Sequence, residues 1–244
     1  MKRVIIIIAI VLLVVTVIAG FVVNYCFSPS VSIKEHQLNL LNLYQKFAAA
    51  CQEYNIPFWA NGGTLLGARR HQGFIPWDDD MDFEVPAPYI LKLRQLNGEL
   101  KSKFGIKIDQ FLLWKSDPYA LKVSNADDSS NMLFLDVFGV DMIDNCYYTY
   151  KSPSLRKLWP KEFHDTDVSS DIEYVPFETL QLPVPRSYSY LQNTFGDWRV
   201  EAKTPSHFFW IDGQMPQVTK HLLYITLAVC FGIVTLIILP MCCV

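Results

Sequence analysis

Two long apolar runs at the chain ends are the feature that most limits how this chain can fold. Val4–Val23 contains no charged residue, and neither does Leu222–Leu239. At ~1.5 Å of rise per residue, each run is long enough to cross a hydrocarbon core about 30 Å thick. The pattern predicts three parts: an N-terminal transmembrane signal anchor (residues 1–27), a folded domain (28–220) and a C-terminal transmembrane helix (221–244).

Other interpretations of the apolar runs remain open. A cleaved secretory signal is the alternative for the first run, although its apolar core is typically only ~7–15 residues long. For the second run, the alternatives are a buried core helix and a processed lipid-anchor signal. Lys2 and Arg3 precede the first run and favour a cytosolic N-terminus. We therefore expect a membrane protein of the Golgi or endoplasmic reticulum whose folded domain is lumenal.

Charge and cysteine content exclude some classes of protein. The chain of 244 residues has a net charge of −3 and no basic run, so we expect no nucleic-acid partner. It contains no Cys-x-x-Cys sequence, so a zinc ribbon has no support. Cys51 and Cys146 lie well inside the folded domain, and their spacing does not decide whether they pair.

The region between the apolar ends contains alternating helix and strand signals. Ser32–Glu35 forms a capping box, so a helix should start there and end near Tyr54–Asn55, before Pro57. Further helices are expected at Leu65–His71, which Thr64 would cap and Gly73 would close, and at Tyr89–Leu100. Strands are expected at residues 57–60, 80–85, 106–114, 119–123 and 133–140. Later prolines should divide the chain into short pieces.

An acidic strand carries the first candidate site. In the sequence Asp80-Met81-Asp82-Phe83-Glu84, alternation places the three carboxylates on one face and the apolar side chains on the other. Carboxylates two residues apart lie about 7 Å apart along a strand. Asp80 and Asp82 can therefore reach a shared divalent cation.

Asp136 lies in the apolar segment Leu133–Phe138 and is the second candidate. A carboxylate among apolar neighbours is costly to bury without a partner, and a metal ion is one such partner. If its strand lies beside the acidic strand, Asp136 completes a three-carboxylate site. Oxygen ligands suit Mg²⁺ or Mn²⁺ rather than zinc.

These acidic residues also have simpler interpretations. The acidic run is compatible with a solvated loop, and Asp136 with a satisfied core residue. A calcium-binding EF-hand loop is excluded, because Phe83 and Tyr89 stand where the loop needs Gly and Glu.

A glycine turn precedes the acidic strand. Asn61-Gly62-Gly63-Thr64 follows a predicted strand and starts a predicted helix. Glycines in that place allow backbone amides to approach phosphate oxygens, and a helix N-terminus adds positive potential.

Four segments resemble the signature of the LicD family. That family includes phosphocholine transferases of bacterial glycans, and it is similar to the fukutin-related sugar-phosphate transferases. The segments are Gly62–Asp82, Leu135–Phe138, Phe177–Pro185 and Tyr190–Trp198, and the likeness spans residues 38 to 199. Phe195 departs from the pattern, which usually has Tyr before Gly-Asp-Trp.

The resemblance implies an α+β nucleotidyltransferase fold, with a small mixed sheet flanked by helices. It implies metal-dependent transfer of a phospho-alcohol, phosphocholine or a polyol phosphate, from a CDP-linked donor to a glycan hydroxyl. Asp80 and Asp82 match the family's metal-binding pair, and Asp136 matches its third acid. Phosphate contacts are expected from Gly62, Gly63, Thr64, Arg69, His71 and Lys122. The alternative is a catalytically inactive, membrane-anchored binding module or scaffold of the same fold.

Overall fold

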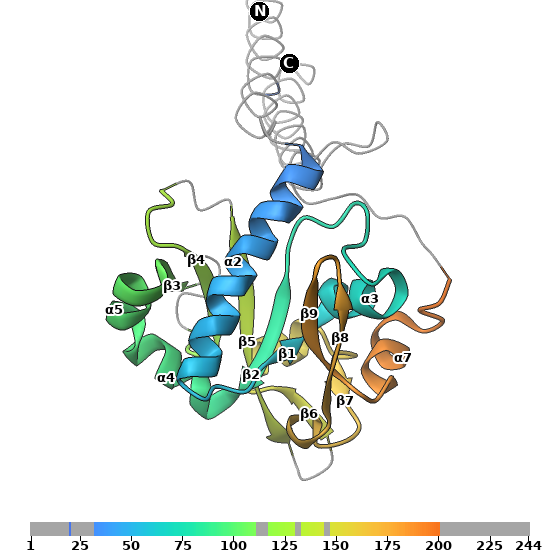
Figure 1. Cartoon of the computed structure of the whole chain (residues 1–244). Helices are drawn as coiled ribbons and strands as arrows, with labels where there is room; N and C mark the ends of the chain where they lie inside the picture. The colour runs from blue at the N-terminus through green and yellow to red at the C-terminus, as the bar shows by residue number, and fades with distance from the viewer. Residues whose placement is uncertain (1–19, 21–31, 111–116, 130–132, 144–146, 201–244) are drawn as a thin grey trace, which may run out of the picture. The chain divides into compact units, whose positions relative to one another are not determined.

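A mixed β-sheet positions the candidate site. The structure, a computed structural model, describes residue 20 and residues 32–110, 117–129, 133–143 and 147–200. The strands of the main sheet are Trp59–Ala60 (β1), Asp82–Pro86 (β2), Ile106–Gln110 (β3), Ala120–Asn125 (β4), Phe134–Ile143 (β5), Tyr147–Tyr150 (β6) and Phe163–His164 (β7). Their order is β1-β2-β5-β4-β3, with β6 beside β5 and β7 beside β6 (Figure 1). Only the β2–β5 pair is parallel within this described sheet.

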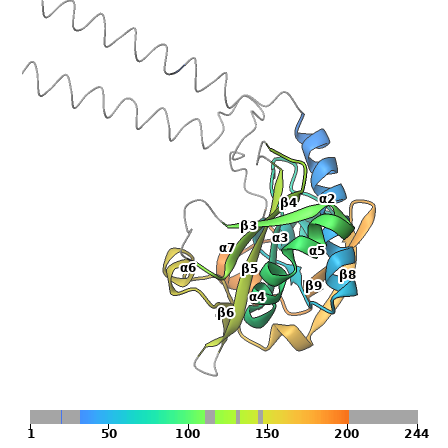
Figure 2. The same cartoon turned by 90° about the vertical axis from the view of Figure 1, so that its left-hand side faces the viewer.

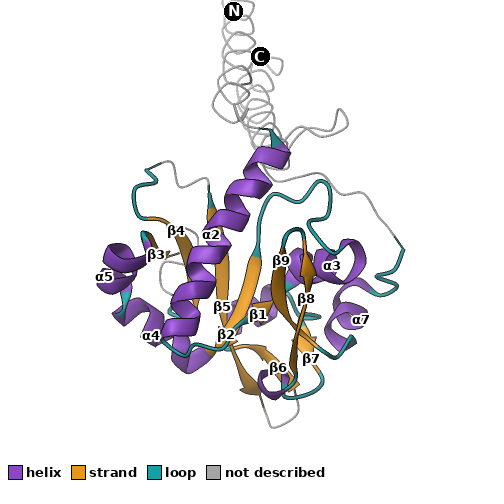
Figure 3. Cartoon of the chain, viewed as in Figure 1, coloured by secondary structure: helices purple, strands orange, loops and turns teal. Residues whose placement is uncertain are grey.

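Helices and one hairpin surround this sheet (Figure 3). The helices are Ile33–Glu53 (α2), Gly62–His71 (α3), Ala87–Gln95 (α4), Asn97–Glu99 (α5), Pro153–Leu158 (α6) and Ser189–Phe195 (α7), with a π-helical turn at Leu100–Phe104 and a 3₁₀ turn at Val168–Ser170. Ile172–Phe177 (β8) and Leu180–Pro185 (β9) form a separate two-stranded hairpin. This mixture confirms the expected α+β class with a small sheet flanked by helices.

One face of the sheet is closed by α2 and α4. Phe83 on β2 points to this face, where the Tyr44 ring of α2 stacks on it at 5.4 Å and Phe47 lies 5.9 Å away. Gly139 on β5 leaves room for Ile90 of α4, since a Cβ at Gly139 would lie 2.8 Å from that side chain. The alternation predicted for the acidic strand is therefore confirmed on its apolar side.

The opposite face is covered only in part. Trp59, Phe138, Tyr150 and Leu155 form a buried cluster there, and the Trp159 ring packs on it. Figure 2 shows α2 and α6 on opposite sides of β5. The cluster covers the downstream part of β2, whereas Asp82 at the start of the strand remains partly exposed.

Several predicted boundaries differ from the structure. The third helix begins at Ala87, directly after β2, and the turns that follow continue to Phe104. Helix α3 begins at Gly62 and ends at His71, with Gln72 as its left-handed C-cap in place of Gly73. The proline-rich region, for which we predicted only short pieces, contains the β8–β9 hairpin.

Apart from Gly20, both predicted membrane spans lie outside the described residues, as does Cys146. Within the described part, no helix is long and apolar enough to cross a membrane. Cys51 is a buried free thiol on α2.

Candidate active site

Three charged side chains form a row across three neighbouring strands. Asp82 of β2 is the direct partner of Asp136 on β5, and Asp136 is the direct partner of Lys122 on β4. Neighbouring strands lie only about 4.8 Å apart. The expected meeting of Asp82 and Asp136 is thus present, and Lys122, which we predicted as a phosphate contact, lies beside Asp136 on β4.

The carboxylates in this row influence one another. The pKa of Asp82 is raised well above its ordinary value, chiefly because its carboxylate is withdrawn from water, and then because of Asp80, Asp136 and Asp78. Asp80 itself lies just before β2. Although Asp82 as a whole residue is partly exposed, the set is a concentration of negative charge that a cation would relieve.

Lys122 supplies the positive charge of the row. Its ammonium lies 3.2 Å from the ring centroid of Phe134. Burial lowers the pKa of Lys122, and the nearby Asp136 opposes that shift. The amine is therefore held beside the carboxylates, in a position to meet an anionic group.

The glycine turn lies directly against the acids. Gly62 has φ +52, and a Cβ there would lie 2.7 Å from Asp82 Oδ2. A Cβ at Gly63 would lie 2.8 Å from Asp78 Oδ2. Only glycine fits at both positions, because the backbone there lies so close to the Asp82 and Asp78 carboxylates. Helix α3 begins at Gly62, so its N-terminus lies beside Asp82.

Thr64 has a different role from the predicted one. It does not cap α3, because the carbonyl of Asn61 already accepts the first helical bond, from Leu65 N–H at 2.9 Å. Thr64 is buried, and its Oγ1 accepts a hydrogen bond from the backbone N–H of Asp82 at 2.8 Å. Its observed contact fixes the acidic strand.

Helix α2 holds the loop before β2. His36 Nε2 lies 2.9 Å from the carbonyl oxygen of Asp79, and Gln37 Nε2 donates to the carbonyl oxygen of Asp78 at 2.8 Å. These contacts join residues about forty positions apart, and no sequence pattern singled out His36 or Gln37.

Glu84 is buried and is not part of the row formed by Asp82, Asp136 and Lys122. Its side chain is 1% exposed, and its Oε2 lies 2.8 Å from His164 Nε2. The same oxygen accepts a hydrogen bond from Trp59 Nε1 at 2.6 Å. Glu84 thus anchors β2 two residues beyond Asp82, and His164 is an anchoring residue that sequence reasoning missed.

Arg69 and His71 lie near the far end of α3 from the glycine turn. Arg69 pairs with Glu173 on β8 at 2.8 Å, and its guanidinium lies 4.9 Å from the ring centroid of Tyr188. His71 Nε2 accepts a hydrogen bond from Arg70 Nε at 2.9 Å. Arg69 is seven residues from Gly62, about 10 Å along a helix, so its observed role is to fasten the hairpin.

Asp80, Asp82 and Asp136, which we call the acidic row, are suited to a cation that is shared with a substrate. Within the described residues, no three His, Cys, Asp or Glu side chains form a ready-made metal cage. Mg²⁺ at phosphate-transfer sites commonly takes only one or two carboxylates and completes its shell with substrate phosphates and water. Asp80, Asp82 and Asp136 are the carboxylates that would serve such a cation, and the glycines at 62 and 63 let the backbone lie close against Asp82 and Asp78.

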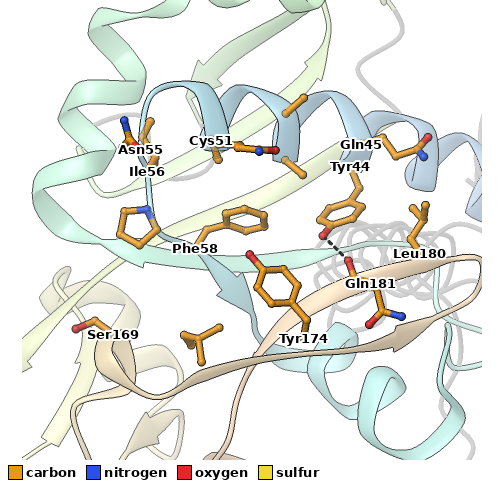
Figure 4. A pocket seen from close by; sticks show the side chains of 15 residues that line it. Tyr44, Gln45, Cys51, Asn55, Ile56, Phe58, Ser169, Tyr174, Leu180 and Gln181 are labelled. Carbon is orange, nitrogen blue, oxygen red and sulfur yellow. Dashed lines mark hydrogen bonds between the residues drawn. The ribbon is translucent and has the colours of Figure 1, made fainter.

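A cavity in the described part of the chain lies elsewhere. It has a volume of about 960 Å³ and is bordered by α2 and the β8–β9 hairpin, where Tyr44, Phe58 and Tyr174 line it (Figure 4). The Tyr44 hydroxyl donates to the Gln181 carbonyl oxygen at 3.0 Å across it. Tyr44 stacks on Phe83, on the sheet face opposite to Asp82, so this cavity is separate from the acidic row.

Comparison with known protein families shows to which family the chain belongs. The family described as LicD/FKTN/FKRP, nucleotidyltransferase domain, matches residues 55–187, more than half of the chain. The chain belongs to this LicD family. The match includes the glycine turn, β2, β5 and the hairpin.

Curated relatives of this LicD family member include named transferases. Lipopolysaccharide cholinephosphotransferase LicD of Haemophilus influenzae is 53% identical over 51 residues, covering 21% of this chain and 19% of that protein. Human ribitol-5-phosphate transferase FKTN is 27% identical over 180 residues, covering 66% and 33%. Human ribitol 5-phosphate transferase FKRP is 25% identical over 162 residues, covering 60% and 29%. The chain thus spans a third or less of each of these three relatives.

A solved structure of lincosamide antibiotic adenylyltransferase LnuA, bound to lincomycin, is also similar. It shares 12% identity at a TM-score of 0.37, covering 75% of this chain and 94% of that one.

Proposed function

We propose that this LicD family member is a metal-dependent phosphotransferase. It would move a phospho-alcohol, phosphocholine or a polyol phosphate, from a CDP-linked donor to a glycan hydroxyl. The observation that carries the proposal is the direct register of Asp82, Asp136 and Lys122 beside the glycine turn. The names of the cholinephosphotransferase and ribitol-5-phosphate transferase relatives support the choice of transferred group.

Each residue of the site would have a distinct role in phosphoryl transfer. Such reactions depend on alignment and charge neutralisation more than on covalent help from the protein. Mg²⁺ or Mn²⁺ held by Asp80, Asp82 and Asp136 would neutralise the donor pyrophosphate and the leaving CMP. Lys122 would bind a phosphate oxygen, and Gly62 would present backbone to the donor.

Asp136 has a second possible role in this proposal. If it does not ligate the cation, its carboxylate would accept the proton of the attacking glycan hydroxyl. Neither step is assigned to Arg69 or His71, because Arg69 pairs with Glu173 on the hairpin and His71 Nε2 accepts a hydrogen bond from Arg70.

The proposed setting is a membrane. The two apolar ends would hold the domain at the lumenal face of the Golgi or endoplasmic reticulum, where glycan acceptors are present. This part of the proposal rests on residues 1–27 and 221–244 and on Lys2 and Arg3.

A donor panel tests the function. The full-length chain is incubated with CDP-choline, CDP-ribitol or CDP-glycerol, with Mn²⁺ or a chelator, and CMP release is measured beside Asp82→Asn. We expect release from one donor, only with metal and only by the wild type. Metal-dependent binding of a donor without release, even with glycan present, would instead favour the inactive binding module. Neither binding nor release from a folded protein would favour the scaffold.

A further inference from the structure

Glu162, just before β7, is a carboxylate that the proposed reaction does not use. It is half-buried, and Tyr150 donates its hydroxyl hydrogen bond to Glu162 Oε2. Among the described ion pairs, none joins Glu162 to Lys or Arg. A carboxylate withdrawn from water without a cationic partner is costly, so a specific use for it should be sought.

The hydrogen bonds continue from Glu162 to the glycine turn. Tyr150 is 1% exposed, and its hydroxyl accepts a hydrogen bond from Asn61 Nδ2 at 2.9 Å. Asn61 is also 1% exposed and immediately precedes Gly62. Glu162, Tyr150 and Asn61 thus form one relay, in which each member orients the next.

The last member of the relay touches the acidic strand. The backbone N–H of Asn61 donates to the carbonyl oxygen of Asp82 at 3.0 Å. At the next residue, Gly62, there is no space for a Cβ beside the Asp82 carboxylate. A shift of Asn61 would therefore change the separation between the glycine turn and Asp82.

We propose that Glu162 is a positioning residue that acts through Tyr150 and Asn61 to hold the glycine turn against Asp82. Buried hydrogen bonds of this kind fix the separation of the groups that they join. Asn61 takes part through Nδ2, whereas its Oδ1 has no hydrogen-bond partner among the described residues. The inference rests on the proposed function where it concerns donor binding, because the glycine turn would face the donor phosphates. Its structural part, the placement of the turn, is independent of any activity.

Tyr148 provides a matched control for Tyr150. Both are buried tyrosines on β6, two positions apart, and removal of either hydroxyl leaves the aromatic ring in place. Tyr150→Phe breaks the relay, whereas Tyr148→Phe does not touch it. We expect Tyr150→Phe alone to speed amide hydrogen exchange in the peptide that covers Trp59–Leu66.

The kinetic signature separates positioning from general loosening. With full-length protein, we expect Tyr150→Phe to raise KM for the CDP donor about ten-fold and to leave KM for the glycan unchanged, as lost orientation of the turn predicts. Glu162→Ala should behave like Tyr150→Phe. Glu162→Gln keeps an oxygen that accepts from Tyr150, so it should stay within about three-fold of wild type.

Three results would overturn the inference. Hydrogen exchange at Trp59–Leu66 that is unchanged in Tyr150→Phe, or changed equally in Tyr148→Phe, would show that the relay does not place the turn. A loss in Glu162→Gln as large as in Glu162→Ala would make Glu162 an acid–base group rather than a positioning one. If wild type releases no CMP from any donor, the proposed function fails, and hydrogen exchange still decides the relay.

Discussion

At the scale of single residues, the candidate site is shaped by close contacts around Asp82. Asp82 is approached from one side by the Gly62 backbone, and its own N–H is held by Thr64 Oγ1 at 2.8 Å. Asp136 lies beside it on the next strand, with Lys122 beyond. The sequence predicted Asp82, Asp136 and Lys122 as site residues, but the contact of Thr64 depends on a partner eighteen positions away that no local pattern encodes.

Gly62→Ala tests the close approach at Asp82. The new Cβ would meet Asp82 Oδ2 at 2.7 Å, and φ +52 is unfavourable for alanine. A misplacement of about 1 Å at a reacting centre can lower the rate on the order of a hundred-fold, so we expect at least a ten-fold loss of CMP release. Gly98→Ala is the control, because a Cβ there meets nothing within 4 Å. Equal activity of the two variants would show that the turn does not shape the site.

Glu162 predicts a pH effect on stability. Burial raises its pKa above 4.5, the hydrogen bond from Tyr150 opposes the shift, and Glu84 adds to it. Because the folded state holds this proton more tightly than the unfolded state, the stability from protonated Glu162 is lost as pH rises from about 4.5 through the folded pKa. Tyr190 on α7 and Asp82 on β2 also face this region.

Glu162→Gln should remove that loss. Its free energy of unfolding relative to wild type, measured by urea denaturation from pH 4 to pH 8, should rise with pH and then level off. A difference that falls with pH, or does not change, would contradict the assigned direction of the pKa shift.

At the scale of elements, the sequence predicted what local patterns encode. The alternation in β2 and the apolar run of β5 were recognisable, and the capping box at Ser32 marked the start of α2. The β8–β9 hairpin was missed because Pro183 and Pro185 argue against strands. Both are tolerated because this sheet has only two strands, so a residue without an N–H can face an open edge.

Helix α3 and the hairpin are joined by a half-buried ion pair, in which the Glu173 side chain is 28% exposed, and its strength can be tested. Glu173 on β8 pairs with Arg69, whose side chain is 8% exposed, and with Arg186, whose side chain is 58% exposed. Removal of one partner of a fully buried pair costs about 3 kcal/mol, whereas exposed pairs contribute roughly 0–1 kcal/mol, and the half-buried Arg69–Glu173 pair should lie between these limits. Arg69→Ala should therefore unfold at clearly lower urea concentration than Arg186→Ala.

The KM for the donor provides a second test of the role of Arg69. If Arg69 only fastens the hairpin, Arg69→Ala protein that remains folded should keep its KM for the donor within about three-fold of wild type. A large rise in donor KM without loss of stability would restore Arg69 as a phosphate contact.

At the scale of the whole folded unit, one face of the sheet forms the core and the other carries the candidate site. The face under α2 and α4 is closed by Phe83, Phe47 and their neighbours and supplies the core. The other face buries Glu84 in the middle of β2 and presents Asp82, the first residue of β2, beside Asp136. The family match over residues 55–187 covers the elements that create this division. The buried relay behind the row required the three-dimensional arrangement, because its members are spread over a hundred residues.

The central claim is that the acidic row performs metal-dependent transfer, and one comparison tests it most directly. Single-turnover CMP release is measured with Mn²⁺ for Asp136→Asn and for Asp141→Asn, which alters another aspartate of β5, one that pairs with Lys151 at 2.8 Å. We predict that Asp136→Asn lowers the rate at least about a hundred-fold and Asp141→Asn less than about three-fold. Equal rates in the two variants, or a wild-type rate unaffected by chelator, would contradict the account.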